Sequence, residues 1–176
     1  MSIFKIIKTA TLSLVTLALI SCSSDTRDTD TGDISKIRNL IQPAQNKWAG
    51  GQPNKNQLTT FAQMGVKHVV NLRPAAELDW NEGEYVESLG INYYLIPIES
   101  VDDISPANAK RLADILQSVG AEKALVHCAS GNRVGALKAF AAGALDGKTT
   151  EEAIAHGKLW GITSLEPEVR QKLLSR

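Results

Sequence analysis

The chain has 176 residues, which is enough for one compact domain with a hydrophobic core. Its 19 basic and 19 acidic residues balance, so no excess of positive charge favours nucleic acid as a partner. The sequence shows no internal repeat and no second domain, and it holds only two cysteines, Cys22 and Cys128.

The first 21 residues have the layout of an export signal. Lys5 and Lys8 form a positive segment, and residues 10–20 form an apolar segment that polar residues end too soon for a comfortable membrane span. We therefore predict that residues 1–21 are a signal peptide, absent from the mature protein.

The residues that end this signal, Leu19-Ile20-Ser21-Cys22, resemble a bacterial lipobox. The resemblance implies cleavage before Cys22 and a lipid on its thiol, which would anchor the protein to a membrane. Ser23 stands where an aspartate would resemble an inner-membrane retention signal, so we expect a periplasmic protein on the outer membrane. The alternatives are an ordinary secretory signal with a chance cysteine and an uncleaved anchor.

Residues 23–33 contain no apolar side chain, so we predict that residues 22–33 comprise the lipidated cysteine and a solvated tether. The domain then spans residues 34–176. Once Cys22 carries a lipid, Cys128 has no disulfide partner within the chain. A lone thiol in an oxidising compartment favours a chemical role, although a buried cysteine can also serve as a small apolar residue.

Within the domain, strand patterns alternate with helix patterns. We predict strands at 46–53 (an edge strand), 66–72, 91–98 and one ending at residue 127, and helices at 54–63, 77–89, 106–119, 133–145, 150–161 and 166–174. This order predicts a three-layer α/β fold with a small, mainly parallel sheet flanked by helices. Ligands of such sheets bind at the carboxyl ends of the strands, which Arg73, residues 99–103 and Cys128 follow.

Residues 124–135 combine the end of a buried strand, a turn of small residues and the start of a helix. Their backbone N–H groups can form a concave site for a tetrahedral anion such as phosphate, with Cys128 at its floor and Arg133 at its side. The residues expected to form this cradle are Ala129, Ser130, Gly131, Asn132 and Val134. The amides, the helix dipole and the guanidinium all favour the thiolate form of Cys128.

The run His127-Cys128 with Gly131 and Arg133 resembles the signature of Cys-based protein tyrosine and dual-specificity phosphatases, His-Cys-x-x-Gly-x-x-Arg. Only four residues separate Cys128 from Arg133, where the common signature has five. The closer resemblance is to the bacterial beta-lactamase-hydrolase-like phosphatases, whose loop is similarly short. The upstream runs Gly50-Gly51-Gln52-Pro53 and Val70-Asn71-Leu72-Arg73-Pro74, followed by Glu77, are similar to motifs of that family in the same order.

The resemblance implies a dual-specificity-phosphatase-like fold and hydrolysis of phosphate monoesters in two steps. Cys128 would attack phosphorus, Arg133 and the loop amides would hold the phosphoryl oxygens, and water would hydrolyse the thiophosphate. His127 would support the loop from behind, and Arg73 would either pair with Glu77 or meet the substrate. The expected substrate is a phosphorylated small molecule or protein, and no metal or organic cofactor is implied. The oligomeric state is not predicted.

Related phosphatases place a proton-donating aspartate on the loop before the long helix. Here that loop offers Glu99, Asp102 and Asp103, of which we select Asp102 or Asp103 as the general acid. The same two residues can equally serve helix entry. Two other functions stay open: a rhodanese-like sulfurtransferase that carries a persulfide on Cys128, and a non-catalytic anion-binding lipoprotein.

Overall fold

The computed structural model describes residues 32–175. The predicted signal peptide, Cys22 and all but the end of the predicted tether lie outside these residues. Within the described range, five strands form a single sheet in the order β1-β2-β5-β3-β4. Their bounds are β1 Ile41–Ala44, β2 Lys47–Gly50, β3 Val66–Asn71, β4 Asn92–Leu95 and β5 Lys123–His127.

Strand β5 is the centre of the sheet. It pairs in parallel with β2 on one side and with β3 on the other, and β3 pairs in parallel with β4. Only β1 is antiparallel, to β2. The last residue of β5, His127, lies between Gly50 and Asn71, so the residues that follow it emerge at the middle of the carboxyl edge.

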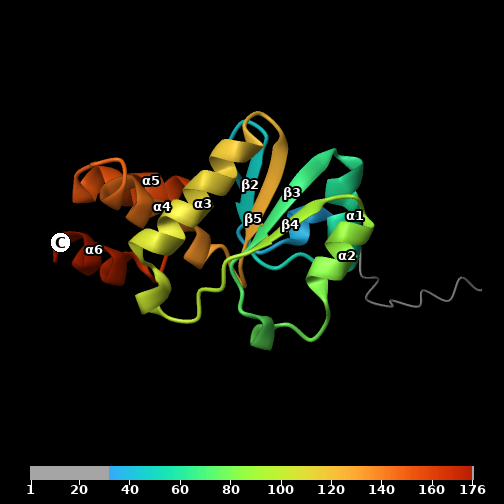
Figure 1. Cartoon of the computed structure of the whole chain (residues 1–176), viewed down its shortest axis with the longest axis horizontal. Helices are drawn as coiled ribbons and strands as arrows, with labels where there is room; N and C mark the ends of the chain where they lie inside the picture. Colours follow the sequence, from blue (N-terminus) through green and yellow to red (C-terminus); the bar gives the residue numbers. More distant parts are fainter. Residues whose placement is uncertain (1–31, 176) are drawn as a thin grey trace, which may run out of the picture.

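Helices cover both faces of this sheet (Figure 1). Within residues 32–175 the α-helices are α1 Lys55–Gln63, α2 Glu82–Ser88, α3 Pro106–Val119, α4 Asn132–Ala144, α5 Thr150–Leu159 and α6 Glu166–Leu174. Helices α1 and α2 pack on one face, where Phe61 and Val86 meet Leu125 of β5. Helices α3 and α4 pack on the other face, where Leu112 and Leu137 meet Val126, and α5 and α6 pack against α4. The predicted three-layer α/β class is confirmed.

The prediction that residues 46–53 form an edge strand is wrong. The strand exists as β2, but residues 41–44 pair with it as β1 and take the edge. The pattern missed β1 because it is only four residues long and contains Pro43, whose missing N–H is tolerated at an edge.

The single helix predicted at 77–89 is divided. Residues Ala75–Glu77 form a short 3-10 helix, η2, and α2 begins only at Glu82. The division arises at Asn81, whose side-chain oxygen accepts a hydrogen bond from the Glu84 N–H and so caps a new helix. The break carries Glu77 and Glu82 to separate positions near the carboxyl edge.

Helices α4 and α5 approach each other closely at two glycines. A Cβ atom on Gly135 would come within 1.9 Å of the Ile162 nitrogen, and one on Gly157 within 2.5 Å of the Ala139 Cβ. This contact places residues 161–165 against the start of α4. Among residues 32–175, no helix combines the length and the apolar character needed to span a membrane.

Candidate active site

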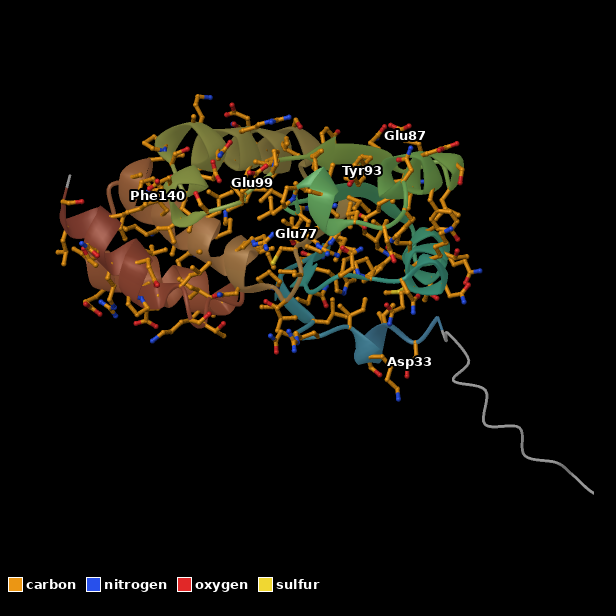
Figure 2. The ribbon with its side chains drawn as sticks, turned by 90° about the horizontal axis from the view of Figure 1, so that it is seen from below. Asp33, Glu77, Glu87, Tyr93, Glu99 and Phe140 are labelled. Atoms are coloured by element: carbon orange, nitrogen blue, oxygen red, sulfur yellow. The ribbon has the colours of Figure 1, made fainter. Side chains whose placement is uncertain are left out.

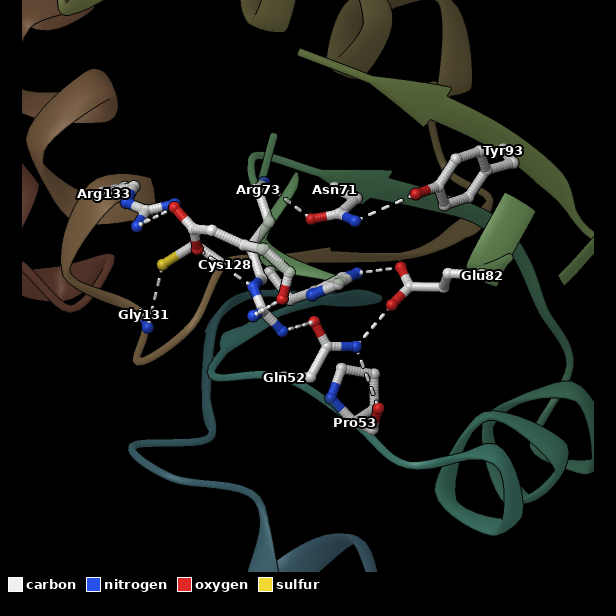
Figure 3. A network of polar contacts seen from close by, with 11 residues as sticks. Gln52, Pro53, Asn71, Arg73, Glu82, Tyr93, Cys128, Gly131 and Arg133 are labelled. Atoms are coloured by element: carbon white, nitrogen blue, oxygen red, sulfur yellow. Dashed lines mark hydrogen bonds and ion pairs between the residues drawn. The ribbon is translucent and has the colours of Figure 1, made fainter. Parts of the chain in front are cut away.

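The turn between β5 and α4 curls around the sulfur of Cys128. Gly131, which precedes α4, has a φ of +86°, a left-handed conformation that suits glycine. This conformation lets the Gly131 N–H donate a hydrogen bond to Cys128 Sγ at 3.1 Å (Figure 3). Cys128 is only 1% exposed, so the sulfur lies inside the turn.

The segment before β1 and the segment after β2 both contact this turn. Asn39 donates from its side chain to the Ser130 carbonyl at 2.9 Å, and Gly51 forms an isolated bridge with Ser130. A Cβ atom on Gly51 would lie 3.0 Å from the Ala129 carbonyl oxygen and equally close to that of Arg38. The bare backbone of Gly51 therefore permits the close approach that fixes the loop.

Asn132 opens helix α4 and ties it to the chain that follows α5. Its Oδ1 accepts hydrogen bonds from the N–H groups of Thr163 at 2.8 Å and Leu165 at 3.3 Å, and its Nδ2 donates to Ser164 Oγ at 2.8 Å. The side chain thus faces residues 163–165 rather than the sulfur. Two members of the predicted cradle, Asn132 and the buried Val134, lie in the first turn of α4, where N–H groups lack partners within the helix.

Arg133 is held at the site by Glu77. Its Nη2 donates to Glu77 Oε1 at 2.7 Å, while its Nη1 is buried and has no hydrogen-bond partner among the described residues. Burial raises the pKa of Glu77, but hydrogen bonds from Arg133 and Arg73 outweigh it, so the pKa lies below the ordinary value. The carboxylate therefore stays ionised and orients the guanidinium. Figure 2 places Glu77 near the centre of the molecule, between the two groups of helices.

Arg73 pairs with Glu77, which is one of the two roles proposed from the sequence. Its Nε donates to Glu77 Oε2 at 3.1 Å and its Nη2 to the Glu77 carbonyl. Its Nη1 donates to Gln52 Oε1 at 2.7 Å. All three nitrogens of the guanidinium are thus engaged within the protein.

His127 ends β5, immediately before Cys128, and its side chain meets a buried carboxylate. Its Nε2 is 2.8 Å from Glu82 Oε1, and both side chains are fully buried. The other oxygen of Glu82 accepts a hydrogen bond from Gln52 Nε2. Burial raises the pKa of Glu82, but His127, followed by Gln52 and Arg73, lowers it more, so the pKa lies below the ordinary value.

Sequence analysis did not assign roles to Gln52 or Glu82, and it did not connect Glu77 with Arg133. Gln52 and Glu77 stand in the runs that resemble family motifs, so a signal for them was present. Glu82 has no such signal, because it is one of several acidic residues around α2 and only the tertiary structure buries it.

The two predicted general acids occupy different surroundings. The Asp102 side chain is 99% exposed and lies 3.8 Å from Lys172. Asp103 Oδ2 accepts hydrogen bonds from the N–H groups of Ser100 and Glu99, which hold the pKa of Asp103 below its usual range. A carboxylate held ionised in this way is poorly suited to donate a proton.

A cavity of about 180 Å³ lies between Arg133 and the 99–103 loop, which contains these acids. Its walls are mostly apolar, and Glu99 is the acidic residue that lines it. The lining residues are Ile98, Glu99, Ser100, Val101, Ile104, Arg133 and Leu165. Nowhere in residues 32–175 do three or more His, Cys, Asp or Glu side chains gather in a way that could hold a metal ion.

The fold is similar to that of several solved structures. A candidate phosphatase (DUF442) from Shewanella putrefaciens has a TM-score of 0.61 and 24% identity, over 79% of this chain and 88% of that chain. Tk-PTP in its active form has a TM-score of 0.59 and 20% identity, over 78% and 97%. TpbA from P. aeruginosa has a TM-score of 0.58 and 17% identity, over 79% and 85%.

The expected phosphatase-like fold is therefore confirmed. No protein-family model matches the sequence, and no curated protein matches it. At these identities the similarity shows the fold.

Replacing Glu77 by glutamine should destabilise the fold in a pH-dependent way. A carboxylate whose pKa is lowered by folding stabilises the protein above its unfolded pKa, about 4.3, and loses that effect as pH falls through the folded pKa. We expect Glu77→Gln to lower the free energy of unfolding by about 1 kcal/mol at pH 7. The difference should shrink towards zero below about pH 4.

Urea titrations at several pH values measure this difference, with Glu87→Gln, an exposed position of α2, as the matched control. A loss of stability of the same size at pH 7 and pH 3 would contradict the prediction.

Proposed function

We propose that the protein is a Cys-dependent phosphatase that hydrolyses phosphate monoesters, including phosphotyrosine in proteins, through a thiophosphate intermediate. The observation that carries this proposal is the buried Nη1 of Arg133, which has no partner among the described residues and lies beside the turn around Cys128. A buried guanidinium N–H calls for an acceptor, and a phosphoryl oxygen supplies one.

The chemistry needs only groups that this site holds. The Cys128 thiolate forms a bond to phosphorus while the bond from phosphorus to the ester oxygen breaks, and the leaving oxygen takes up a proton. Water then attacks phosphorus, which releases inorganic phosphate and regenerates the thiolate. Arg133 and the N–H groups at the start of α4 stabilise the charge on the phosphoryl oxygens in both steps.

Phosphotyrosine is supported as a substrate by a neighbouring structure. A cysteine variant of TpbA from P. aeruginosa, with a TM-score of 0.51 and 14% identity, was solved in complex with phosphotyrosine. The cavity next to Arg133 in the present chain is mostly apolar and suits the ring of an aryl ester. We therefore favour aryl phosphates over small polar esters.

The nucleophile is tested by Cys128→Ser. With 4-nitrophenyl phosphate as substrate, we expect turnover to fall by at least about 1,000-fold, because a serine hydroxyl at this position has no general base. Wild-type turnover should also be inhibited by vanadate. Circular dichroism controls for folding, and Ser118→Ala on the exposed side of α3 is a control for the purification.

Retained turnover in Cys128→Ser would refute the mechanism. The sulfurtransferase alternative has a separate signature, because thiosulfate would leave an adduct of one sulfur mass on Cys128 and cyanide would remove it. Phosphate binding without turnover of any ester or of thiosulfate would favour the non-catalytic anion-binding protein.

We further propose Glu99 as the donor of the leaving-group proton. It is the acidic residue of the 99–103 loop that lines the cavity shared with Arg133. Asp103 is committed to the loop backbone through two hydrogen bonds, and Asp102 projects into solvent. The roles of the three carboxylates can be distinguished by replacing each one and comparing the hydrolysis of esters with good and poor leaving groups.

Replacing Glu99 by glutamine should slow esters with poor leaving groups more than those with good ones. We expect kcat for phenyl phosphate to fall by about 100-fold and kcat for 4-nitrophenyl phosphate by less than about 10-fold. Steady-state kinetics of Glu99→Gln, Asp102→Asn and Asp103→Asn measure the contrast, with Glu87→Gln as control. A larger leaving-group effect in either aspartate variant would instead identify that residue as the acid.

The location of the protein is a separate proposal. The lipobox-like run before Cys22 supports a periplasmic protein that is anchored by lipid to the outer membrane. Cys22→Ala should transfer the protein from the membrane fraction to the soluble fraction of cells, as measured by fractionation and immunoblotting. Ser23→Ala serves as the matched control, and unchanged partitioning of Cys22→Ala would contradict the anchor.

A further inference from the structure

An unbroken series of side-chain hydrogen bonds connects the two ends of the loop that carries Cys128. We call these side chains the polar ring, because the backbone from residue 127 to residue 133 closes it (Figure 3). In order of contact, its members are His127, Glu82, Gln52, Arg73, Glu77 and Arg133.

Gln52 is the one member of the ring whose side chain cannot carry a charge, and both ends of its amide are used. Nε2 donates to Glu82 and to the Pro53 carbonyl, the latter at 3.0 Å. Oε1 accepts from Arg73 Nη1 at 2.7 Å. A neutral side chain that donates at one end and accepts at the other is what a carboxylate and a guanidinium require between them.

The two halves of the ring hold opposite ends of the loop. On one side, Glu82 meets His127, the residue that precedes the sulfur-bearing Cys128. On the other side, Arg73 and Glu77 orient Arg133, the second residue of the helix beyond the loop. Since Gln52 joins these halves, its loss removes one hydrogen bond from the buried Glu82 carboxylate and one from the Arg73 guanidinium.

We propose that Gln52 is a positioning residue: by linking Glu82 to Arg73 it sets Cys128 and Arg133 at the spacing that binds a tetrahedral oxyanion. It does not touch the anion and acts through the ring. The inference rests on the proposed function, because it concerns the same loop, but its test measures anion binding and does not require turnover.

The experiment compares Gln52→Met, which keeps the length of the side chain without its polar atoms, with the wild type. Binding of inorganic phosphate is measured by isothermal titration calorimetry at pH 7, and folding is checked by thermal unfolding. We expect the Kd for phosphate to rise by about 10-fold, because without this link Cys128 and Arg133 are no longer held at the binding spacing before phosphate arrives. Gln117→Met, on the exposed side of α3, should bind phosphate like the wild type.

A second variant, Gln52→Glu, gives a readout that a merely structural role would not produce. The carboxylate that this substitution introduces repels Glu82 when it is ionised, so phosphate binding at pH 7 should again be weaker than in the wild type. When the new carboxyl group is protonated, it can donate to Glu82 and accept from Arg73, as the glutamine amide does. The ratio of the Kd of this variant to the wild-type Kd should therefore fall towards one as the pH is lowered from 7 to 5.

The outcomes separate this inference from the proposed function. Phosphate affinity within about twofold of wild type in a folded Gln52→Met overturns the inference, even if the wild type hydrolyses aryl phosphates. If Gln52→Met does not fold, the inference is tested by Gln52→Glu alone. It is overturned if the ratio of the Gln52→Glu Kd for phosphate to the wild-type Kd does not change between pH 7 and pH 5. A third outcome is that the Gln52 variants bind phosphate more weakly, that low pH restores binding in Gln52→Glu, and that the wild type hydrolyses no phosphate ester. This outcome supports the role of Gln52 and refutes the proposed phosphatase activity.

Discussion

The site depends on a carboxylate in a place where charge is costly. Glu82 has no solvent contact, and burial alone would drive it to its neutral form. His127 and Gln52 reverse this tendency, and in return Glu82 fixes the imidazole of the residue that immediately precedes Cys128. The packing of α2 on the sheet makes this pairing possible, because the imidazole belongs to the central strand and the carboxylate to the first residue of α2.

The fold was largely predictable because its signals are local. Asn54, Ser105 and Thr149 cap helices through their own side chains, and the apolar runs of β3 and β5 match buried parallel strands. The failures also have local causes. Strand β1 contains a proline, which argues against a strand, and Asn81 begins a new helix inside a continuous helical pattern.

The site was predictable only in part. The loop from Cys128 to Arg133 is contiguous, so sequence could place a thiol, a glycine turn and a guanidinium together. Gln52 and Glu82 come from other parts of the chain, and their meeting depends on the sheet order and on the division of residues 77–89. For Asp103 the sequence allowed both proton donation and helix entry, and only the structure shows that its carboxylate accepts hydrogen bonds from the loop backbone.

The hydrogen bonds of the Asn132 side chain also make the start of α4 depend on a later part of the chain. Its partners Thr163, Ser164 and Leu165 lie 31 to 33 residues further along the chain. Gly135 must likewise receive the backbone of Ile162. During synthesis, the sheet and the loop can therefore assemble before the start of α4 has its final support. The N-terminus of α4, where we propose that the anion binds, therefore has its full set of contacts only once residues 161–165 have docked against it.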